Sequence, residues 1–230
     1  MISVIIPTLN SEAELAHALA ALVPGAADGV VREVILVDGG STDHTEQVSD
    51  AAGCVWLTMK GPRSARMAYG AENAQRGHWL LFLSPETVLE GGWHHEVQNF
   101  VERVERAGTA SKSAAMFKMR LDSFGMRARL SEFFALLRAQ FLSMPYGNQG
   151  LLITRQYYHE LGGHRPLPEL EDLDLVRRIG RSRLVFLRSG AVCSGNPDEP
   201  GLLASFRKSF ARFLAGALRV PPKLLLRLHG

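Results

Sequence analysis

The stretch that decides the fold is Val-Ile-Leu-Val-Asp-Gly-Gly-Ser-Thr-Asp, residues 34–43. Its four apolar residues are typical of a strand buried on both faces, and the run ends in a carboxylate, Asp38. Gly39 and Gly40 follow, and then a polar segment typical of a helix start. Ligands of α/β proteins bind at the carboxyl ends of parallel strands. The stretch therefore predicts an acid at the mouth of a parallel sheet.

The start of the chain repeats this pattern. Residues 2–10 read Ile-Ser-Val-Ile-Ile-Pro-Thr-Leu-Asn, so a second strand-like run ends in a polar turn that contains Thr8 and Asn10. Two such units at the beginning of a chain are typical of a nucleotide-binding sheet. We therefore expect a nucleotide pocket where these two strands end.

Strand-like and helical segments alternate through the first 90 residues. We expect strands over 2–6, 33–37, 55–59 and 79–83, and helices over 12–22, 44–52 and 65–76. Ser11 with Glu14, and Asp43 with Glu46, have the spacing of capping boxes that start the first two helices. This alternation predicts an α/β fold with a mainly parallel sheet covered by helices on both faces.

The second half of the chain is less regular. We expect helices over 96–107, 127–142, 157–161 and about 170–180, strands over 116–121 and 151–154, and a tight polar turn over 146–150. We divide the chain into a main domain over 1–200 and a tail over 201–230. Within the main domain, a nucleotide-binding half covers about 1–90 and an acceptor half about 91–200.

Composition argues against a disulfide-rich protein, a zinc protein and a membrane-spanning protein. The 230 residues are 46% hydrophobic and 21% charged, which is enough to bury an ordinary core. The two cysteines, Cys54 and Cys193, form no disulfide framework and no zinc motif, so a reducing compartment is the default. The chain shows no secretory leader and no run of about 18 apolar residues. We therefore expect a cytoplasmic protein.

The tail is basic and amphipathic. After Glu199 there are six basic and no acidic residues, although the whole chain carries only +3. Apolar side chains recur on one helical face from Leu203 to Ala217, and basic side chains lie on the other. This pattern predicts peripheral binding to an anionic surface, such as the inner face of the cell membrane. The alternative is a helix that packs its phenylalanine face on the domain or on a second subunit.

These motifs together resemble the family 2 glycosyltransferases, which have the GT-A fold. The resemblance rests on residues 5–10 and 37–43, and it continues through an Arg-rich segment over 61–71. The segments 80–83, 147–149 and 171–175 extend it, so that it covers about 1–180. The chain is most similar to a small bacterial subgroup of about this length. The resemblance implies an inverting transfer of sugar from a nucleotide-diphospho-sugar, linked to UDP or GDP, to an acceptor hydroxyl.

On the donor side, the resemblance implies that Pro7 and Thr8 contact the base through their backbone, and that Asp38 accepts a hydrogen bond from the base or ribose. An acceptor-only carboxylate suits N–H and O–H donors, and Gly39 lets backbone approach a flat base. The alternative for Asp38 is to cap the amides of its own turn. Arg63 and Arg66, at the start of the third helix, have the chemistry to bind a diphosphate, although surface arginines are common.

A divalent cation is the expected cofactor, but the motif for it is degraded. The family usually has Asp-x-Asp after the fourth strand, whereas this chain has Ser84-Pro85-Glu86. Glu86 remains as a candidate ligand for Mg²⁺ or Mn²⁺, because the diphosphate would supply further oxygens. The alternative is that Glu86 is only a surface acid.

On the acceptor side, the resemblance implies that Asp172 is the base that removes the proton of the acceptor hydroxyl. On a helix over 170–180, Asp172 shares a face with apolar residues, which predicts a raised pKa. The alternative is a first-turn acid that complements the helix dipole. Glu171 is expected to orient rather than react, and Asn148 and Gln149 form an acceptor-side turn or a turn without further role.

Other interpretations of the chain remain open or are disfavoured. The degraded motif leaves open a catalytically inactive relative that binds a nucleotide or acts as a scaffold. A dinucleotide-dependent oxidoreductase is disfavoured, because no Gly-x-Gly-x-x-Gly follows the first strand. Nucleic acid is not an expected partner, because the basic residues concentrate in an apolar tail without a recognition module.

Overall fold

The computed structural model describes residues 1–121, 149–167 and 171–193. It is an α/β protein built on one sheet with the strand order β3-β2-β1-β4-β7-β6-β8-β5. The strands are β1 (Ile2–Thr8), β2 (Val31–Asp38), β3 (Val55–Thr58), β4 (Trp79–Phe82), β5 (Thr87–Leu89), β6 (Ala114–Leu121), β7 (Leu151–Thr154) and β8 (Leu184–Cys193). The predicted fold class is confirmed, and the first four strands fall where the sequence places them.

The first four strands of the chain run parallel. β1 pairs with β2 and β4, and β2 pairs with β3 on its other edge. Every residue of β1 is buried, as expected for a central parallel strand covered on both faces. The register pairs Thr8 with Asp38, so the two polar side chains at the strand ends lie side by side.

Beyond β4 the sheet becomes mixed. β7 runs antiparallel to both β4 and β6, while β8 pairs parallel with β6 and antiparallel with β5. β5 and β8 were not predicted from the sequence. β5 is only three residues long, and the pairing of β8 with β6 shifts in register between Met116 and Lys118 of β6. Such an irregularity hides the two-residue periodicity by which strands are predicted.

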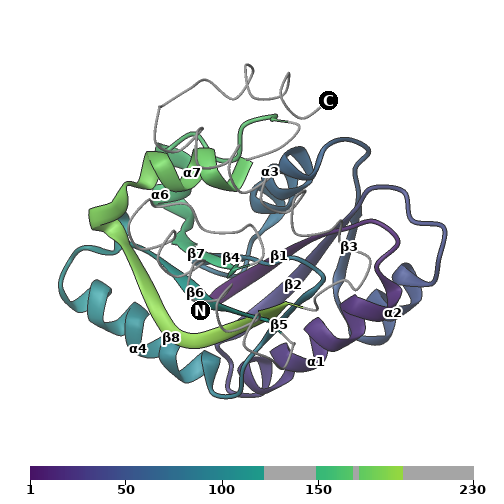
Figure 1. Cartoon of the computed structure of the whole chain (residues 1–230), viewed down its shortest axis with the longest axis horizontal. Helices are drawn as coiled ribbons and strands as arrows, with labels where there is room; N and C mark the ends of the chain where they lie inside the picture. The colour runs from purple at the N-terminus through teal and green to yellow at the C-terminus, as the bar shows by residue number, and fades with distance from the viewer. Residues whose placement is uncertain (122–148, 168–170, 194–230) are drawn as a thin grey trace.

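Helices cover both faces of the sheet, as Figure 1 shows. The described helices are α1 (Glu12–Ala27), α2 (Thr45–Ala51), α3 (Arg63–Asn73), α4 (Trp93–Arg106), α6 (Arg155–Glu160) and α7 (Glu171–Ile179), with short 3₁₀ turns η1 (Ala110–Lys112) and η3 (Arg181–Arg183). α1 and α4 close one core, and α3, α6 and α7 close the other. α1 extends five residues beyond the end predicted from the sequence.

The predicted capping box at Ser11 is wrong. Its hydroxyl donates to the carbonyl oxygen of Leu9 and makes no capping bond to α1. Instead, Asp43 from the β2–α2 loop accepts from the backbone N–H of Glu12 at 3.1 Å and from that of Thr45 at 3.1 Å. One carboxylate therefore serves the amino ends of both α1 and α2, which joins the two loops at the carboxyl edge of the sheet.

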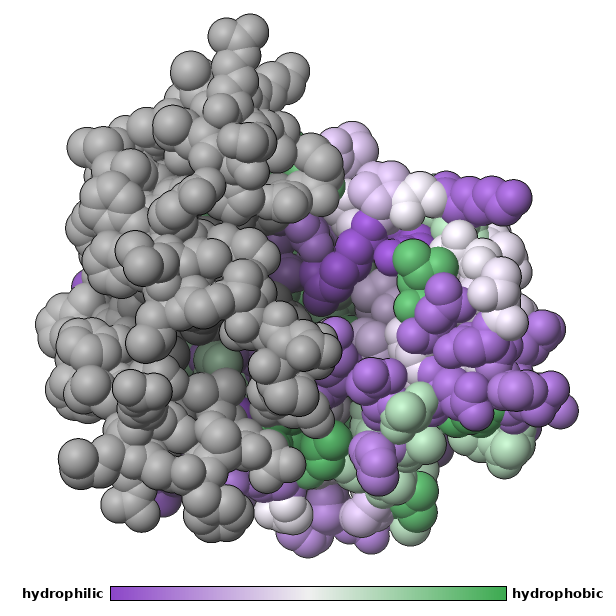
Figure 2. Space-filling model, turned by 45° about the vertical axis from the view of Figure 1, so that its right-hand side comes forward, coloured by the Kyte–Doolittle hydropathy of each residue, from purple (hydrophilic) through white to green (hydrophobic). Residues whose placement is uncertain are grey.

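Several predictions fall outside the described residues: the helix over 127–142, the turn residue Asn148, the boundary at residue 200 and the tail over 201–230. They stay predictions. No helix in the described part of the chain is long and apolar enough to cross a membrane. The described surface in Figure 2 is mostly hydrophilic, and its hydrophobic residues form small separate patches.

Candidate functional site

The site begins where β1 and β2 end. The hydroxyl of Thr8 donates to Asp38 Oδ1 at 3.1 Å, and the N–H of Gly39 donates to the carbonyl oxygen of Thr8 at 2.9 Å. Both side chains are buried, with 0% of Thr8 and 3% of Asp38 exposed. Pro7 lies in the same strand end, in register with Val37. The two predicted nucleotide-binding segments are therefore joined before any ligand arrives.

Asp38 organises the turn that follows it. Its Oδ2 accepts from the backbone N–H groups of Gly40 and Ser41, both at 2.7 Å, and its Oδ1 accepts from the Ser41 hydroxyl at 2.5 Å. Burial tends to raise the pKa of Asp38, but the hydrogen bonds from Ser41, Gly40 and Thr8 outweigh it and hold the pKa below its usual value. Asp38 is therefore ionised at neutral pH and caps its own loop, which is the alternative role that the sequence left open.

Arg66 reaches the same strand ends from the first turns of α3. Its Nη1 donates to the carbonyl oxygen of Thr8 at 2.9 Å, and the residue is only 8% exposed. A Cβ on Gly39 would lie 1.9 Å from this Nη1. Gly39 thus leaves room for the guanidinium group of Arg66. Burial lowers the pKa of Arg66, Asp38 raises it and Arg63 lowers it, with a net shift downward.

Arg63 is the first residue of α3 and points to the opposite wall. Its Nη1 lies 2.6 Å from Glu171 Oε1 and 2.7 Å from Asp172 Oδ2, so one nitrogen bridges two carboxylates. Burial would lower the pKa of Arg63, but Asp172 and Glu171 raise it above its usual value. The neighbouring Ser64 hydroxyl donates to the carbonyl oxygen of Leu167 at 2.8 Å. The start of α3 therefore holds the segment that leads to α7.

The predicted raised pKa of Asp172 is wrong. The apolar residues of its helix face are buried as expected, and Leu175, Val176 and Ile179 are at most 1% exposed. Burial does tend to raise the pKa of Asp172, but the charge of Arg63 and the neighbouring His164 lower it to about 2. The helical pattern identified the apolar side of α7, but not the cation that α3 brings to it.

Tyr158 and His164 complete this wall, and sequence reasoning missed both. His164 Nε2 lies 3.5 Å from Asp172 Oδ1, and the Tyr158 hydroxyl lies 2.9 Å from His164 Nδ1. Tyr158 is in α6 and His164 is in the α6–α7 loop. The only signal in the sequence is the pair Gly162-Gly163 before His164, because both glycines have positive φ and turn the chain back toward Tyr158.

The remaining predicted residues that the structure describes are Glu86 and Gln149. Glu86 is exposed and lies in the turn between β4 and β5, at the same edge of the sheet as Thr8. Gln149 is buried, with 1% exposed, and precedes Gly150 at a φ of 69°. Within the described ranges, no trio of histidine, cysteine or acidic side chains gathers around Glu86.

A different cluster could hold a metal ion, but it lies away from this site. Asp28, His94 and His95 have ligand atoms within 4.8 Å of one another. Asp28 follows the last residue of α1, whose first residue lies at the carboxyl edge of the sheet, so the cluster is at the far end of that helix. It therefore does not replace the predicted cation site beside the diphosphate.

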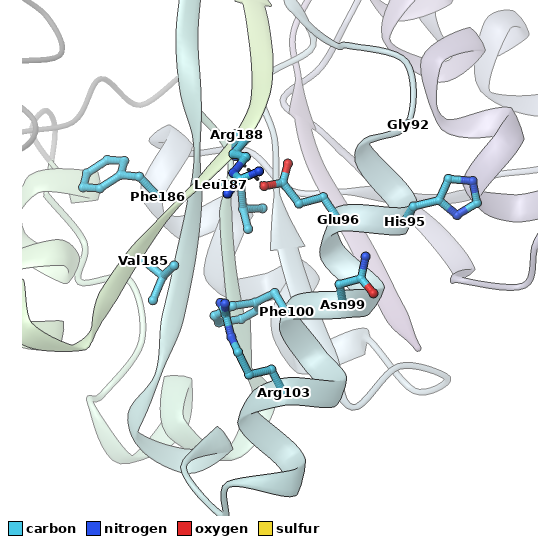
Figure 3. Close-up of a pocket in the computed structure, with 10 residues that line it drawn as sticks. All are labelled: Gly92, His95, Glu96, Asn99, Phe100, Arg103, Val185, Phe186, Leu187 and Arg188. Atoms are coloured by element: carbon cyan, nitrogen blue, oxygen red, sulfur yellow. Dashed lines mark hydrogen bonds between the residues drawn. The ribbon is translucent and has the colours of Figure 1, made fainter.

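A hollow of about 480 Å³ lies between α4 and β8 and contains none of the predicted site residues. Figure 3 shows the side chain of Glu96 directed from α4 to the backbone of β8. Its carboxylate accepts from the N–H groups of Arg188 at 2.5 Å and Ser189 at 2.7 Å. Glu96 is thus committed to holding β8, and its hydrogen bonds there outweigh burial, which would raise its pKa, and hold that pKa below the usual value.

The arrangement links two acids through one helix. Arg66 of α3 lies close enough to Asp38 of β2 for this carboxylate to raise its pKa. Arg63, one turn earlier on α3, binds Asp172 of α7. Asp38 and Asp172 are therefore linked through the start of α3, since Arg66 bonds to Thr8 beside Asp38 and Arg63 bonds to Asp172. Such a pair of cations between a sheet edge and an acidic helix suits a diphosphate on one side and a hydroxyl on the other.

Comparisons with known proteins identify the family and the fold. Residues 3–160 match the sequence model of glycosyl transferase family 2. A search of curated protein sequences gave no significant match. Glucosyl-3-phosphoglycerate synthase from Mycobacterium tuberculosis, solved with Mn²⁺, UDP and glucosyl-3-phosphoglycerate, has a TM-score of 0.58 at 21% identity. The match covers 96% of this chain and 81% of that one.

Two further structures have the same fold. TarS from S. aureus has a TM-score of 0.61 at 16% identity, covering 97% of this chain but 41% of that one. GalNAc-T7, solved with UDP, GalNAc and Mn²⁺, has a TM-score of 0.65 at 12% identity, covering 86% of this chain and 44% of that one. At these identities the likeness shows the GT-A fold alone. The family match covers more than half of the sequence, and this chain therefore belongs to the family 2 glycosyltransferases.

Proposed function

We propose that this glycosyltransferase moves a sugar from a nucleotide-diphospho-sugar to an acceptor hydroxyl with inversion at the anomeric carbon. The observation that carries the proposal is that two arginines at the start of α3 serve the two acids, Arg66 beside Asp38 and Arg63 paired with Asp172. Donor and acceptor would then meet between the two acids. UDP is the nucleotide we favour, because several structures of the same fold were solved with it.

The donor would bind at the ends of β1 and β2. Pro7, Thr8 and Gly39 supply backbone at the strand ends, and Asp38 would accept from the base or ribose after one of its hydroxyl partners turns away. Arg63 and Arg66 are one turn apart on α3, and the charge of Arg63 lowers the pKa of Arg66. Two guanidinium groups at one helix start suit the two phosphates.

A divalent cation fits the donor set in a limited way. Glu86 is the carboxylate at the turn after β4, and Mg²⁺ or Mn²⁺ accepts one carboxylate when phosphate and water oxygens fill the other positions. The structures of the same fold solved with Mn²⁺ support this choice of ion. A bound cation would neutralise charge on the departing diphosphate.

In the chemical step, Asp172 would take the proton of the acceptor hydroxyl as its oxygen attacks the anomeric carbon. The bond from that carbon to the diphosphate oxygen breaks, and its electron pair leaves with the nucleoside diphosphate. Arg63 and Arg66 would stabilise the charge that develops there. Glu171, 9% exposed and paired with Arg63, would orient rather than react.

The acceptor is the least constrained part of the proposal. Gln149, which precedes β7, and the adjacent Asn148 would orient the acceptor hydroxyl. The basic tail over 201–230 would bring the enzyme to an anionic membrane from the cytoplasm, which would suit a lipid-linked acceptor.

One observation favours a second candidate, a nucleotide-binding module without turnover. The pKa of Asp172 is lowered to about 2, and a carboxylate with such a pKa is a weak base. The single acid in Ser84-Pro85-Glu86 points in the same direction. In this alternative the donor still binds, but no sugar is released.

A two-stage experiment separates the candidates. A thermal-shift panel of nucleoside diphosphates and their sugars, with and without Mn²⁺, identifies the donor, because a ligand of the native state raises the melting temperature. Release of the nucleoside diphosphate is then measured with the wild type and with Asp172→Asn. Release that the substitution abolishes supports the enzyme, and binding without release supports the module. No binding by any nucleotide would refute both.

A further inference from the structure

Tyr158 and His164 form a buried pair beside the proposed base. Only 2% of Tyr158 and 5% of His164 is exposed. The Tyr158 hydroxyl lies 2.9 Å from His164 Nδ1 and also accepts from the backbone N–H of His164 at 2.9 Å. The ring of Phe82 packs against both, with centroids 5.1 Å from Tyr158 and 4.8 Å from His164. Packing and hydrogen bonds therefore fix the orientation of the imidazole.

This network selects the position of the imidazole proton. The Tyr158 oxygen already accepts one N–H, and the phenol has one proton to give. His164 Nδ1, at 2.9 Å, is the acceptor for that proton. An imidazole that accepts at Nδ1 carries its own proton on Nε2 when it is neutral. His164 therefore presents an N–H donor on the side that faces α7.

That donor points to Asp172 without yet making a hydrogen bond. Nε2 lies 3.5 Å from Asp172 Oδ1, and it is buried without a hydrogen-bond partner among the described residues. A buried donor left unpaired is costly, so its position calls for an explanation. Hydrogen bonds of catalytic groups are often long before substrates bind and shorten in the complex. The other oxygen of the same carboxylate, Oδ2, is held by Arg63 at 2.7 Å.

We propose that His164, with its tautomer fixed by Tyr158, is a positioning residue that holds Oδ1 of Asp172 and directs Oδ2 toward the acceptor hydroxyl. The inference rests on the proposed function, since it concerns the same base. When a donor diphosphate draws Arg63 toward itself, Asp172 loses its stronger partner. The Nε2–H of His164 then closes on Oδ1 and keeps the carboxylate in place while Oδ2 takes the proton.

The surrounding charges are consistent with this division of roles. Arg63 of α3 pairs with Asp172 of α7, and it also pairs with Glu171 of α7. Arg178 and Glu72 act on Tyr158 with opposite signs. Burial raises the pKa of Tyr158 to about 12, so the phenol keeps its proton and remains a donor to Nδ1 at working pH.

The first test needs no substrate. Long-range ¹H–¹⁵N spectra of the histidine-labelled full chain report which ring nitrogen of His164 carries the proton. We expect the Nε2–H form in the wild type and a mixture of tautomers in Tyr158→Phe. The matched control is Tyr157→Phe, which removes a buried phenol that bonds to the carbonyl oxygen of Ile179. An Nδ1–H form in the wild type would overturn the proposal.

The second test measures turnover against pH. His164→Phe keeps an aromatic ring against Phe82 but has no donor, whereas His164→Gln keeps an N–H at similar reach. We expect His164→Phe to lower kcat by roughly ten- to a hundredfold, since misplacing a catalytic group costs about that much. The donor KM should stay within about twofold. The acid limb of the profile should move to higher pH, because His164 lowers the pKa of Asp172.

The outcomes separate positioning from packing. Recovery of most activity in His164→Gln, with no change in the exposed control His159→Gln, supports the proposal. Equal losses in both His164 variants, with an unmoved pH profile, would show a packing role and overturn it. If the wild type binds a donor but turns over no acceptor, the proposed function fails. The tautomer and the pKa of Asp172 in His164→Phe, read by NMR, then still test the inference.

Discussion

Removing the positive charge of Arg63 should cost more stability than the loss of a surface ion pair. Arg63 bonds to Glu171 and Asp172, whose side chains are 9% and 19% exposed. The pKa of Asp172 falls from its ordinary 3.8 to about 2, and such a shift corresponds to about 2 kcal/mol at neutral pH. Arg63→Gln would also leave two carboxylates without their shared cation. Because Arg63 is itself 27% exposed, we expect a loss of about 2–3 kcal/mol, below that of a fully buried pair.

The decrease in unfolding free energy caused by Arg63→Gln should become smaller as the pH falls. The lowered pKa of Asp172 stabilises the folded state. This contribution is complete above the pKa of the unfolded state, near 4, and is lost as the pH falls toward the pKa of the folded state, near 2. About 1 kcal/mol of it should be gone at pH 3 in the wild type. Arg63→Gln has no such contribution to lose. The difference in unfolding free energy between the two proteins should therefore narrow by about 1 kcal/mol between pH 6 and pH 3.

Urea unfolding at the two pH values tests both statements. The matched control is Arg165→Gln, because Arg165 pairs with Asp174 at 3.6 Å but is 58% exposed, so its loss should stay below about 1 kcal/mol. A cycle with Asp172→Asn isolates the coupling, which we expect to be about 1–2 kcal/mol at pH 6. A loss for Arg63→Gln no larger than that of the control, and independent of pH, would refute the reasoning.

Three further changes test the packing around the site. Gly39→Ala places a methyl group 1.9 Å from Arg66 Nη1, so it should weaken nucleotide binding about tenfold by calorimetry while the melting temperature changes little. Gly70→Ala places one 2.6 Å from the isoleucine side chain of β1 that faces α3, and urea unfolding should show a loss of about 1–2 kcal/mol. Ser41→Ala removes a hydroxyl donor from Asp38, which should cost about 1 kcal/mol and raise the pKa of that carboxylate, read by NMR titration.

Two of the strands that the sequence predicted well contain long buried runs, over all of β1 and over the last four residues of β2. In β1 and β2, uninterrupted apolar runs end in Thr8 and Asp38, and the pairing of parallel strands then places those ends together. β8 was not predicted because contacts with residues distant in the sequence hold it in place. Glu96 of α4 holds the backbone at Arg188 and Ser189, where no local periodicity marks a strand.

The pKa of Asp172 shows the same limit of prediction from local sequence. The helical pattern of α7 correctly grouped Asp172 with buried apolar residues, and burial does push its pKa upward. The opposing contribution comes from Arg63, 109 positions earlier in the chain. Periodicity within one segment contains no information about a charge that another segment supplies. The pKa of a candidate base therefore needs the tertiary structure even where its helix is predicted well.

The low pKa of Asp172 decides how the proposed reaction could proceed. While Arg63 holds the carboxylate, proton transfer from a hydroxyl is disfavoured, because a base with a pKa of about 2 gains little by protonation. Arg66 cannot play the same inhibiting role, since its Nη1 bonds to a backbone carbonyl rather than to Asp172. A diphosphate carries more negative charge than a single carboxylate and offers Arg63 a competing partner near the strand ends. On the proposed function, donor binding would thus raise the basicity of Asp172, and an acceptor that arrives first would find no competent base. Product-inhibition kinetics that show the acceptor binding productively before the donor would exclude this order.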